Sequence, residues 1–402
     1  MRVLVATVFA IPHVGGASTH IELLVSMLRR HGVYKGLLCG NDLDRTSLKK
    51  LGYLLSRLVN ADTARVRSLK DSAMRMAELI AGSEIAKNDG DRVIHCHDPL
   101  ATCAALRSGV KRAVVVQTVH GPWSKESRGN GAVAGCRFDR AIRELEEEAF
   151  AGVHLLLPVD RGQADILRDE YGVPANRIRV IENAVDLDVL TECPGTPLNR
   201  TLPERYFLVP RRLVPKNGVE FAIRGFARTG RNDVGLVIAG DGYLRADLEA
   251  LSRELNVRAS VIFLGDVPRV ELLKIVRGSH AVIVPSVPAN GVVEATSFSV
   301  LEAMAVGVPV IGSAIGGIVE IIPDGSIGFL TPPGDTEAIA SAMESVLSVD
   351  DGTRATIVQN AQARVRDRFG SEVWIKRVLA SYRDSIDGVE AWSTMFSRGR
   401  LP

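Results

Sequence analysis

Two glutamates and the polar residues between them are the first candidates for chemistry. Glu294 and Glu302 have seven residues between them, and the residues after Ser299 form helices well. The N-terminus of such a helix presents free backbone N–H groups that suit a diphosphate. Carboxylates accept hydrogen bonds from sugar and ribose hydroxyls. The spacing therefore predicts an anion site between two hydroxyl-binding carboxylates. The alternative is two surface glutamates flanking an ordinary buried helix.

Three cations follow a short apolar run and form a second candidate site. The run 206–209 predicts a strand, and Arg211, Arg212 and Lys216 come soon after it. Guanidinium and ammonium groups at the carboxyl end of a strand suit a phosphate ligand. A solvated basic loop is the alternative interpretation.

Glycines and a histidine follow other predicted strands. Gly240 opens a Gly-Asp-Gly turn that lets backbone approach a ligand, although Arg245 leaves the dinucleotide-binding fingerprint incomplete. Gly15 and Gly16 precede a predicted helix, and His120 follows the apolar run AVVVQTV. The glycine pair allows close approach to a phosphate or sugar, with a tight strand-to-helix turn as the alternative. His120 is expected to face a ligand because of its place at a strand end.

Strand and helix patterns alternate along the chain and predict how these residues are positioned. The alternation predicts an α/β fold with parallel sheets covered on both faces, and ligands bind such sheets at the carboxyl ends of strands. The candidate strands are 2–9, 36–39, 93–96, 113–117, 153–158, 178–181, 206–209, 235–239, 260–264, 281–284 and 308–312. The clearest candidate helices are 18–31, 140–151, 219–228, 243–255 and 366–385.

Composition limits the class of protein. A chain of 402 residues with 46% hydrophobic residues buries a sizeable core, which excludes a disordered chain and a small disulfide scaffold. The net charge of +2 is spread evenly, so we expect no nucleic-acid partner. An odd number of cysteines, five, with no Cys-x-x-Cys pair fits unpaired thiols in the cytoplasm. No apolar run is long enough to span a bilayer, and the apolar opening residues are interpreted as a strand rather than a signal peptide.

Taken in order, these segments resemble the family 4 glycosyltransferases. The similarity covers Gly15-Gly16, VVQTVHG, the segment IRVIENAVD, PRRLVPKNGVE, IAGDG and the segment with the two glutamates. It continues through GVPVIGSAIGGIVEIIPDGSIGFLTPPGD to the terminal FGSEVWIKRVLASY, and so spans nearly the whole chain. The resemblance implies the GT-B fold, in which two Rossmann-like doubly wound parallel-sheet domains face each other across a cleft.

The expected domain boundaries follow from this fold and from the proline-rich break before the strand at 206–209. Residues 1–188 are expected to form an N-terminal acceptor domain and residues 205–368 a C-terminal nucleotide-sugar domain. Residues 189–204 are expected to be the linker. Residues 369–402 are expected to form a helix that crosses back to the first domain.

The resemblance also implies a reaction. It is that of a retaining, metal-independent hexosyltransferase, which takes its sugar from a nucleotide-diphosphate sugar. We expect a UDP-sugar in preference to a GDP-sugar. The donor is a co-substrate, so no cofactor is expected. The leaving phosphate oxygen would help to deprotonate the acceptor hydroxyl, and positive charge on the diphosphate would stabilise the transition state.

Individual roles carry over by the same resemblance. Glu294 and His120 are the expected catalytic residues, with Glu294 binding hydroxyls of the transferred sugar and His120 lying near that sugar. Glu302 and Gly240 are expected to contact the nucleotide, Glu302 through the ribose. The expected diphosphate-binding residues are Gly16, Arg212, Lys216, Ser297, Phe298 and Ser299.

This chain departs from the family pattern at three places. The lysine that usually follows the arginine of the basic loop aligns with Asn217, and Lys216 stands one place earlier. The usual glycine of the pre-linker segment is Ala184. The residues after Glu294 are Ala-Thr-Ser-Phe instead of a glycine-rich run, which brings more hydroxyls into the site. The first departure leaves open whether Lys216 replaces the lysine that is usual at the position of Asn217.

Other interpretations of the chain are kept as alternatives. A nucleotide-sugar 2-epimerase would need a stronger set of acid/base residues, and a sugar phosphorylase would take phosphate as its acceptor. A non-catalytic nucleotide-sugar binder would be expected to lack Glu294 or the basic loop, and both are present. Three Asp-x-Asp sequences start at Asp42, Asp89 and Asp186, but none follows a long strand with further acidic ligands, so no metal is predicted.

The acceptor and the partners are less constrained. A cell-surface glycan or a lipid-linked sugar is the expected acceptor, with a small natural product as the alternative, and the oligomeric state is left open. Residues 45–75 carry eight Lys/Arg and two Asp, with leucines at helical spacing. Peripheral contact with anionic lipid at the inner membrane face is one interpretation of this stretch. A helix packed on the first domain is the interpretation that we prefer.

Overall fold

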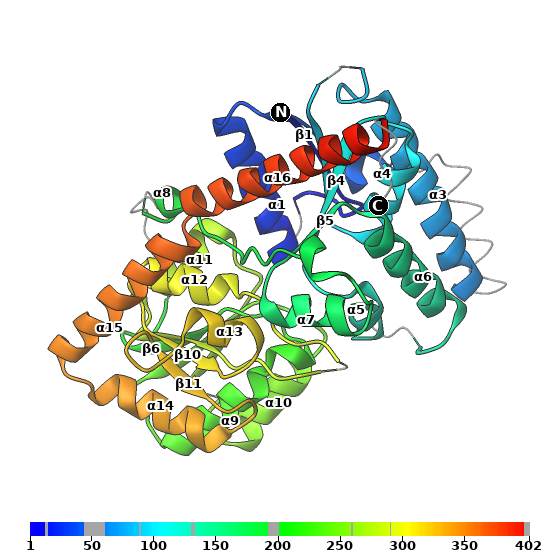
Figure 1. The fold of residues 1–402 in the computed structure, drawn as a ribbon. Helices are drawn as coiled ribbons and strands as arrows, with labels where there is room; N and C mark the ends of the chain where they lie inside the picture. The colour runs from blue at the N-terminus through cyan, green and yellow to red at the C-terminus, as the bar shows by residue number, and fades with distance from the viewer. Residues whose placement is uncertain are drawn as a thin grey trace. The chain divides into compact units, whose positions relative to one another are not determined.

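The chain forms two compact units in the computed structural model, which describes residues 1–12, 15–43, 61–87, 90–129, 133–191, 201–258, 260–289 and 291–397. Unit 1 consists of Met1–Glu182 together with Trp374–Pro402, and unit 2 consists of Asn183–Val373 (Figure 1). Several predicted features lie outside the described residues. They are Asp44, Asp89, Cys193, most of the basic stretch at 45–75 and most of the linker at 189–204.

Unit 1 is built on a five-stranded parallel sheet in the order β2-β1-β3-β4-β5 among its described residues. Strands β4 and β5 are buried at every position except Ala113, because helices cover both faces of a parallel sheet. In β3 every residue is buried, including Arg92 and His95. The strands are β1 Arg2–Ala6, β2 Tyr34–Leu38, β3 Arg92–Cys96, β4 Ala113–Val119 and β5 Leu155–Pro158.

The helices of unit 1 include one from the C-terminal part of the chain. Helix α16, red in Figure 1, lies on unit 1, where its buried Trp374 contacts His20 of α1 and its buried Tyr382 contacts His95 of β3. These rings are part of the unit 1 interior. The helices are α1 Gly16–Arg30, α3 Ala61–Gly82, α4 Pro99–Arg107, α5 Trp123–Gly129, α6 Arg137–Gly152, α7 Arg161–Asp169 and α16 Ser371–Ser397, with short 3-10 turns at Gly40–Asp42 and Ala175–Arg177.

Unit 2 has a six-stranded parallel sheet in the order β11-β10-β9-β6-β7-β8 among its described residues. Its central strands are buried at every position, as two-sided helix cover requires. The strands are β6 Tyr206–Val209, β7 Gly235–Ala239, β8 Val261–Gly265, β9 Ala281–Val284, β10 Val310–Ser313 and β11 Phe329–Thr331. The two parallel sheets confirm the predicted α/β fold class.

Helices cover both faces of the unit 2 sheet. One apolar cluster includes Val300 and Met304 of α12, and another on the sheet includes Ile223 of α9 and Met343 of α14. The helices are α8 Leu187–Thr191, α9 Val219–Thr229, α10 Arg245–Glu254, α11 Arg269–Gly278, α12 Phe298–Ala305, α13 Gly316–Ile321, α14 Thr336–Ser348 and α15 Asp351–Arg364, with a 3-10 turn at Pro215–Asn217 and a π-helical turn at Val365–Phe369.

Aspartates fix where several helices begin. Each accepts a hydrogen bond from a backbone N–H in the first turn, which otherwise has no intrahelical acceptor. Asp98 accepts from Ala101 N at 2.7 Å at the start of α4, and Asp160 accepts from Gln163 N at 2.7 Å at the start of α7. Asp335 and Asp350 do the same for α14 and α15. Local sequence therefore sets these boundaries.

The structure differs from the predicted elements at three places. The run 178–181 forms no strand, although its N–H groups donate to Leu156 O and Pro158 O of β5. Pro158 has no N–H to donate in return, so the ladder stays incomplete. Strand β11 was not predicted because three residues carry too little pattern. The terminal helix does not run through from 366, because the chain is extended at Gly370, where Val185 N donates to Phe369 O and Ser371 N donates to Val185 O.

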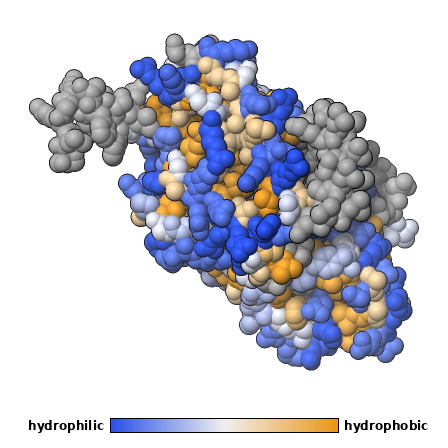
Figure 2. All heavy atoms as spheres, turned by 90° about the vertical axis from the view of Figure 1, so that its right-hand side faces the viewer, coloured by the Kyte–Doolittle hydropathy of each residue, from blue (hydrophilic) through white to orange (hydrophobic). Residues whose placement is uncertain are grey.

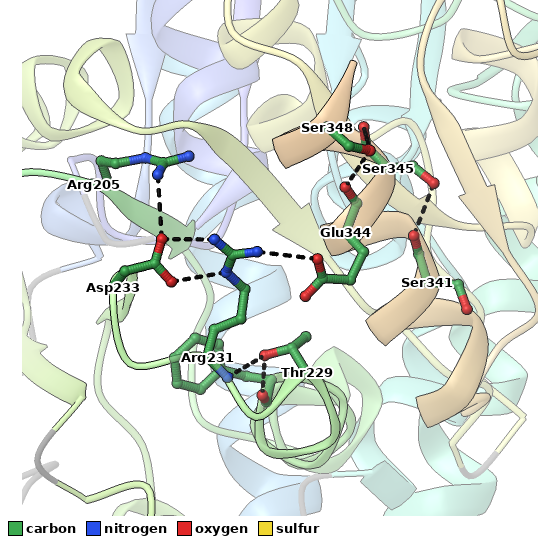
Figure 3. A network of polar contacts seen from close by, with 9 residues as sticks. Arg205, Thr229, Arg231, Asp233, Ser341, Glu344, Ser345 and Ser348 are labelled. Carbon is green, nitrogen blue, oxygen red and sulfur yellow. Dashed lines mark hydrogen bonds and ion pairs between the residues drawn. The ribbon is translucent and has the colours of Figure 1, made fainter.

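A charged network ties the amino ends of β6 and β7 to helix α14 (Figure 3). Arg231 donates to both carboxylate oxygens of Asp233, at 2.8 and 2.6 Å, and to Glu344 of α14 at 3.3 Å. Arg205, just before β6, also reaches Asp233 at 3.3 Å. The hydrogen bonds from Arg231 lower the pKa of the Asp233 carboxyl. These groups are partly exposed to solvent, so the network adds little stability, and it lies at the edge of the sheet opposite the strand ends that carry the candidate site.

The surface offers no membrane-spanning element in the part of the chain that the structure describes: none of its helices is both long enough and apolar enough. Figure 2 shows hydrophilic residues over much of one face, with apolar residues in separate patches.

The described cysteines, Cys39, Cys96, Cys103 and Cys136, are free thiols. This agrees with the expectation of unpaired cysteines for these four positions.

Glycines in the left-handed region bound helix α9 at both ends. Gly218 precedes the helix with φ +60°, and a Cβ there would lie 1.9 Å from Pro285 O. Gly230 follows the helix with φ +62°, and a Cβ there would have no other atom within 4 Å. Both backbones disfavour a side chain, but only Gly218 also packs directly against another backbone segment.

The two glycines form a matched pair for a stability test. We expect Gly230→Ala to lower the free energy of unfolding by about 1 kcal/mol through backbone strain alone. Gly218→Ala should cost about 2–4 kcal/mol, because the segment after β9 must also move away from the new Cβ. Urea unfolding followed by circular dichroism measures both. Equal losses in the two variants would contradict the importance of the Pro285 contact.

Candidate active site

The loop after β6 carries the predicted cations and is fixed by the turn after β7. Leu213 N donates to Asp241 O at 2.9 Å, and Leu244 N donates to Leu213 O at 3.2 Å. A Cβ at Gly240 would lie 2.2 Å from Arg211 O. Close packing against the basic loop therefore explains this glycine, and its predicted contact with the nucleotide stays a prediction.

Arg211 and Glu294 form the central ion pair of the unit 2 site. Arg211 Nη1 lies 3.0 Å from Glu294 Oε1, and Nη2 lies 2.5 Å from Oε2. The same Nη2 lies 2.6 Å from Asn217 Oδ1 and 3.0 Å from Ser286 Oγ. The side chains of the pair are only 10% and 12% exposed. This bidentate geometry is the strong form of an arginine–carboxylate contact.

The surroundings of Glu294 decide its charge. Burial alone would raise the pKa of this carboxyl. The charge and hydrogen bonds of Arg211, together with the nearby charge of Lys216 and a contribution from Ser297, outweigh burial and lower the pKa instead. Glu294 is therefore an ionised hydrogen-bond acceptor at neutral pH, as a hydroxyl-binding carboxylate must be.

Arg212 differs from its neighbour. Its side chain is exposed and makes no hydrogen bond or ion pair with the described residues, while its backbone O accepts from Asn217 Nδ2 at 2.8 Å. Lys216 is half-buried in the 3-10 turn that follows. Of the two predicted diphosphate cations, Arg212 is thus the one that is open to an incoming anion.

Helix α12 starts beside this loop. Ser297 is its N-cap residue, and Ser299 Oγ donates to Pro210 O at 3.2 Å, which joins the helix start to the segment after β6. Asn183 Nδ2 donates to Thr296 O at 2.8 Å and fixes the segment before the helix. The first turn leaves the N–H groups of Phe298 and Ser299 without intrahelical acceptors, so it can take an anion.

Glu302 lies one turn further along α12 and has a different partner from Glu294. Its Oε1 accepts from Arg269 Nη2 at 2.6 Å, at the start of α11. Burial raises the pKa of Glu302, and the charge of Arg269 opposes that effect. The second carboxylate oxygen is left to accept from a ligand hydroxyl. The two glutamates are thus held by two separate arginines.

The predicted site residues of unit 1 lie at the start of α1 and directly after β4. Gly16 is the first residue of α1, directly after Gly15, and residues 13 and 14 are outside the described part of the chain. His120 follows β4 and is half-buried. His97 Nδ1 lies 3.3 Å from His120 Nε2, which is hydrogen-bonding distance.

His120 belongs to a cluster of four histidine rings. His20 lies edge-on to His97 and His120, and His95 stacks on His97 at 4.6 Å. His95 Nδ1 is 2.5 Å from the Tyr382 hydroxyl and its Nε2 is 2.7 Å from Thr118 Oγ1. Burial lowers the pKa of His95 to about 3 and lowers the pKa values of His97 and His120 as well. The three are therefore neutral imidazoles at physiological pH.

Three of these rings are also the described residues best placed to hold a metal ion. Ligand atoms of His20, His97 and His120 lie within 4.8 Å of one another. Imidazole nitrogens around a tetrahedral zinc ion are separated by about 3.3 Å, since each bond is about 2.0 Å. The rings would have to move together within a packed stack, so this spacing favours a hydrogen-bonded cluster.

Sequence reasoning missed two residues of these sites. Arg211 was grouped with the basic loop but was not assigned to the site, although it directly precedes Arg212 and Asn217 stands where a lysine is usual. The sequence assigns no role to His97, and only the fold brings it to His120. No local pattern links residues so far apart.

Comparison with known proteins identifies the family. Residues 14–189 match the model "Glycosyltransferase Family 4", and residues 197–364 match the model "Glycosyl transferases group 1". Together the two matches span both units. The chain is a family 4 glycosyltransferase. Enzymes of this family retain the anomeric configuration of the sugar and are independent of metal ions.

Relatives of this glycosyltransferase share most of its length. It is 28% identical over 396 residues to an uncharacterized glycosyltransferase of Methanocaldococcus jannaschii, covering 93% of this chain and 95% of that one. It is 29% identical over 308 residues to glycogen synthase of Mycobacterium tuberculosis, covering 75% and 70% of the two chains.

Solved structures share its fold. Sucrose-phosphate synthase of Thermosynechococcus elongatus matches with a TM-score of 0.73 at 19% identity, covering 96% of this glycosyltransferase and all of that chain. HepE of Anabaena, solved with UDP-glucose, matches with a TM-score of 0.69 at 18% identity, covering 96% and 100%. These matches confirm the predicted GT-B fold.

The histidine cluster makes unit 1 sensitive to acid. His95 has a folded-state pKa of about 3, below the unfolded value of about 6.5, so its stabilising effect is full above pH 6.5 and is lost as the pH falls. From pH 7.5 to 5.5 this one residue should lower the free energy of unfolding by about 1.4 kcal/mol. Trp123, Trp374 and Trp392 all belong to unit 1, so tryptophan fluorescence during urea unfolding follows this unit.

The matched variant is His95→Gln, which keeps hydrogen-bonding groups but does not titrate. We expect its loss of stability between pH 7.5 and 5.5 to be smaller than that of the wild type by about 1.4 kcal/mol. An identical pH dependence in the two proteins would show that His95 does not titrate as described.

Proposed function

We propose that this glycosyltransferase moves a sugar from a UDP-sugar to the hydroxyl of a cell-surface glycan or a lipid-linked acceptor. Support comes above all from one arrangement in unit 2. The ionised Glu294 is paired with Arg211 of the basic loop. The next residue of that loop, Arg212, has an exposed side chain without a partner among the described residues. Glu294 can accept hydrogen bonds from hydroxyls and Arg212 can bind phosphate, and a nucleotide-sugar offers both a sugar with hydroxyls and a diphosphate.

The diphosphate is bound by Arg212, Lys216 and the N-terminus of α12, with Gly16 of unit 1 contacting it as the resemblance implies. Negative charge grows on the diphosphate as the glycosidic bond breaks. The guanidinium of Arg212 and the N–H groups of Phe298 and Ser299 stabilise that charge. Ser297 contributes through its position at the helix start.

Glu302 accepts hydrogen bonds from the ribose, and Gly240 lies near the nucleotide. Arg269 occupies only one oxygen of Glu302, so the other can serve the ribose. Glu294 and His120 are the residues that contact the transferred sugar. The neutral state of His120 favours a hydrogen-bonding role over a charged one. The leaving phosphate oxygen takes the proton of the attacking hydroxyl.

Uridine is favoured over guanosine because HepE, which shares the fold, was solved with UDP and with UDP-glucose. For the acceptor, a glycan or lipid-linked sugar is proposed ahead of a small natural product. Peripheral contact with the inner membrane face rests on the basic stretch at 45–75, of which only 61–75 is described, within α3. Cytoplasmic location belongs to the same proposal.

Nucleotide binding tests the donor class directly. In calorimetry with EDTA present, we expect UDP and UDP-glucose to bind more tightly than GDP and GDP-glucose. Binding should not change when magnesium is added, because the protein's own cations neutralise the diphosphate. Binding that requires a metal, or binding of none of these nucleotides, would contradict the proposed donor site.

Two substitutions test the residue roles. Arg212→Ala should weaken UDP binding about 10–100-fold, since it removes a charge-assisted contact. Glu294→Gln should lower turnover at least about 100-fold while leaving UDP affinity nearly unchanged, because UDP lacks the sugar. Arg231→Ala, which removes another unit 2 cation from a remote network, is the control and should behave as wild type. Near wild-type turnover of Glu294→Gln would refute its assignment.

A further inference from the structure

Arg211 is a buried cation without a role among the residues predicted for the site. It follows β6, and its guanidinium reaches three other segments: Asn217 in the 3-10 turn, Ser286 after β9 and Glu294 before α12. One planar group thus joins the loops that follow two neighbouring strands to the segment that carries the sugar-binding carboxylate. Such a fork-shaped donor fixes orientation as well as charge.

The charge balance around Glu294 depends on this residue. Two cations act on the carboxylate, Arg211 by direct contact and Lys216 through its charge. Ser286 Oγ, at 3.3 Å, and Ser297 are neutral. With the carboxylate 12% exposed, the loss of Arg211 would leave a largely buried negative charge with one indirect cation.

Asn217 shows how the basic loop accommodates Arg211. Its Oδ1 accepts from Arg211, and its Nδ2 donates to Arg212 O at 2.8 Å, so both ends of the amide are in use. A lysine at this position could not accept a hydrogen bond and would face a like charge. Arginine at 211 and a neutral acceptor at 217 therefore fit each other, whereas arginine at 211 and lysine at 217 do not.

We propose that Arg211 acts as a positioning residue for Glu294 and that the neutral amide of Asn217 is matched to its guanidinium. The guanidinium of Arg211 lies against the Asn217 amide, at the position where the family resemblance leads one to expect a lysine. Arg211 is committed to the carboxylate that holds the sugar, and Arg212 is left to bind the diphosphate. This inference rests on the proposed donor site and specifies how its two arginines divide the work.

The division of roles predicts separate effects on sugar and nucleotide. Arg211→Ala should lower the turnover of UDP-glucose to UDP at least about 100-fold, since Glu294 is no longer held in place. Its affinity for UDP should stay within about threefold of wild type, because UDP makes no contact with Glu294. Arg211→Lys keeps the charge without the fork-shaped donor group, so its turnover should fall between those of wild type and Arg211→Ala. Retained UDP binding also shows that the Arg211→Ala protein is folded.

The pH profile separates positioning through charge from packing. In Arg211→Ala the acid limb of turnover should move up by at least about one pH unit, because Glu294 takes up a proton more easily without its cation. Lys216, the remaining charged group acting on Glu294, is present in both proteins. A lower rate with an unmoved acid limb would overturn the electrostatic role.

An exchange of the cation is the decisive test. Asn217→Lys alone should lower turnover at least about tenfold, because it places like charges side by side. The double variant Arg211→Ala/Asn217→Lys should recover turnover at least about tenfold over Arg211→Ala and restore the acid limb. A double variant no better than the poorer single variant overturns the proposal. Failure of the wild type to bind UDP or UDP-glucose would instead overturn the proposed function, before any variant is made.

Discussion

The contact between Arg211 and Glu294 brings opposite charges together where solvent is largely excluded, and the loops around the ends of the unit 2 strands are arranged around it. Neither charge is tolerable there alone, since a buried carboxylate or guanidinium without a partner is strongly disfavoured. The segments that carry them must therefore meet. The turn after β7 and the residues before α12 close onto the basic loop, with backbone packed directly against backbone at Gly240. The ion pair thus holds the loop after β6 to the segment before α12.

The two units present chemically different surfaces at their strand ends. In unit 2 the candidate residues are charged, and each glutamate has its own arginine. In unit 1 they are neutral aromatic and imidazole rings, which burial keeps uncharged.

Much of this structure could be predicted from the sequence because parallel sheets have a strong signature. Buried strands such as β7 and β9 are continuous apolar runs, and the residues after them fall at one edge of the sheet. Strand β11 escaped prediction because three residues carry no period. The run 178–181 has the composition of a strand, but Pro158 in the neighbouring strand has no N–H with which to complete the ladder. Arg211 and His97 could not be assigned, because their roles depend on partners that only tertiary packing brings near. The break at Gly370 likewise depends on hydrogen bonds to Val185, far earlier in the chain.

The return of α16 to unit 1 has a consequence for how the protein is made. Unit 2 is one continuous stretch of chain, whereas unit 1 is complete only when its last helix has left the ribosome. The hydrogen-bond partner of His95, Tyr382, is synthesised 287 residues later. Until then the sheet of unit 1 lacks the rings of Trp374 and Tyr382 that close over its histidines. During synthesis the second unit can thus finish folding before the first, and an interrupted chain would carry an intact unit 2 beside an open hydrophobic surface on unit 1, the kind of surface that chaperones and proteases recognise.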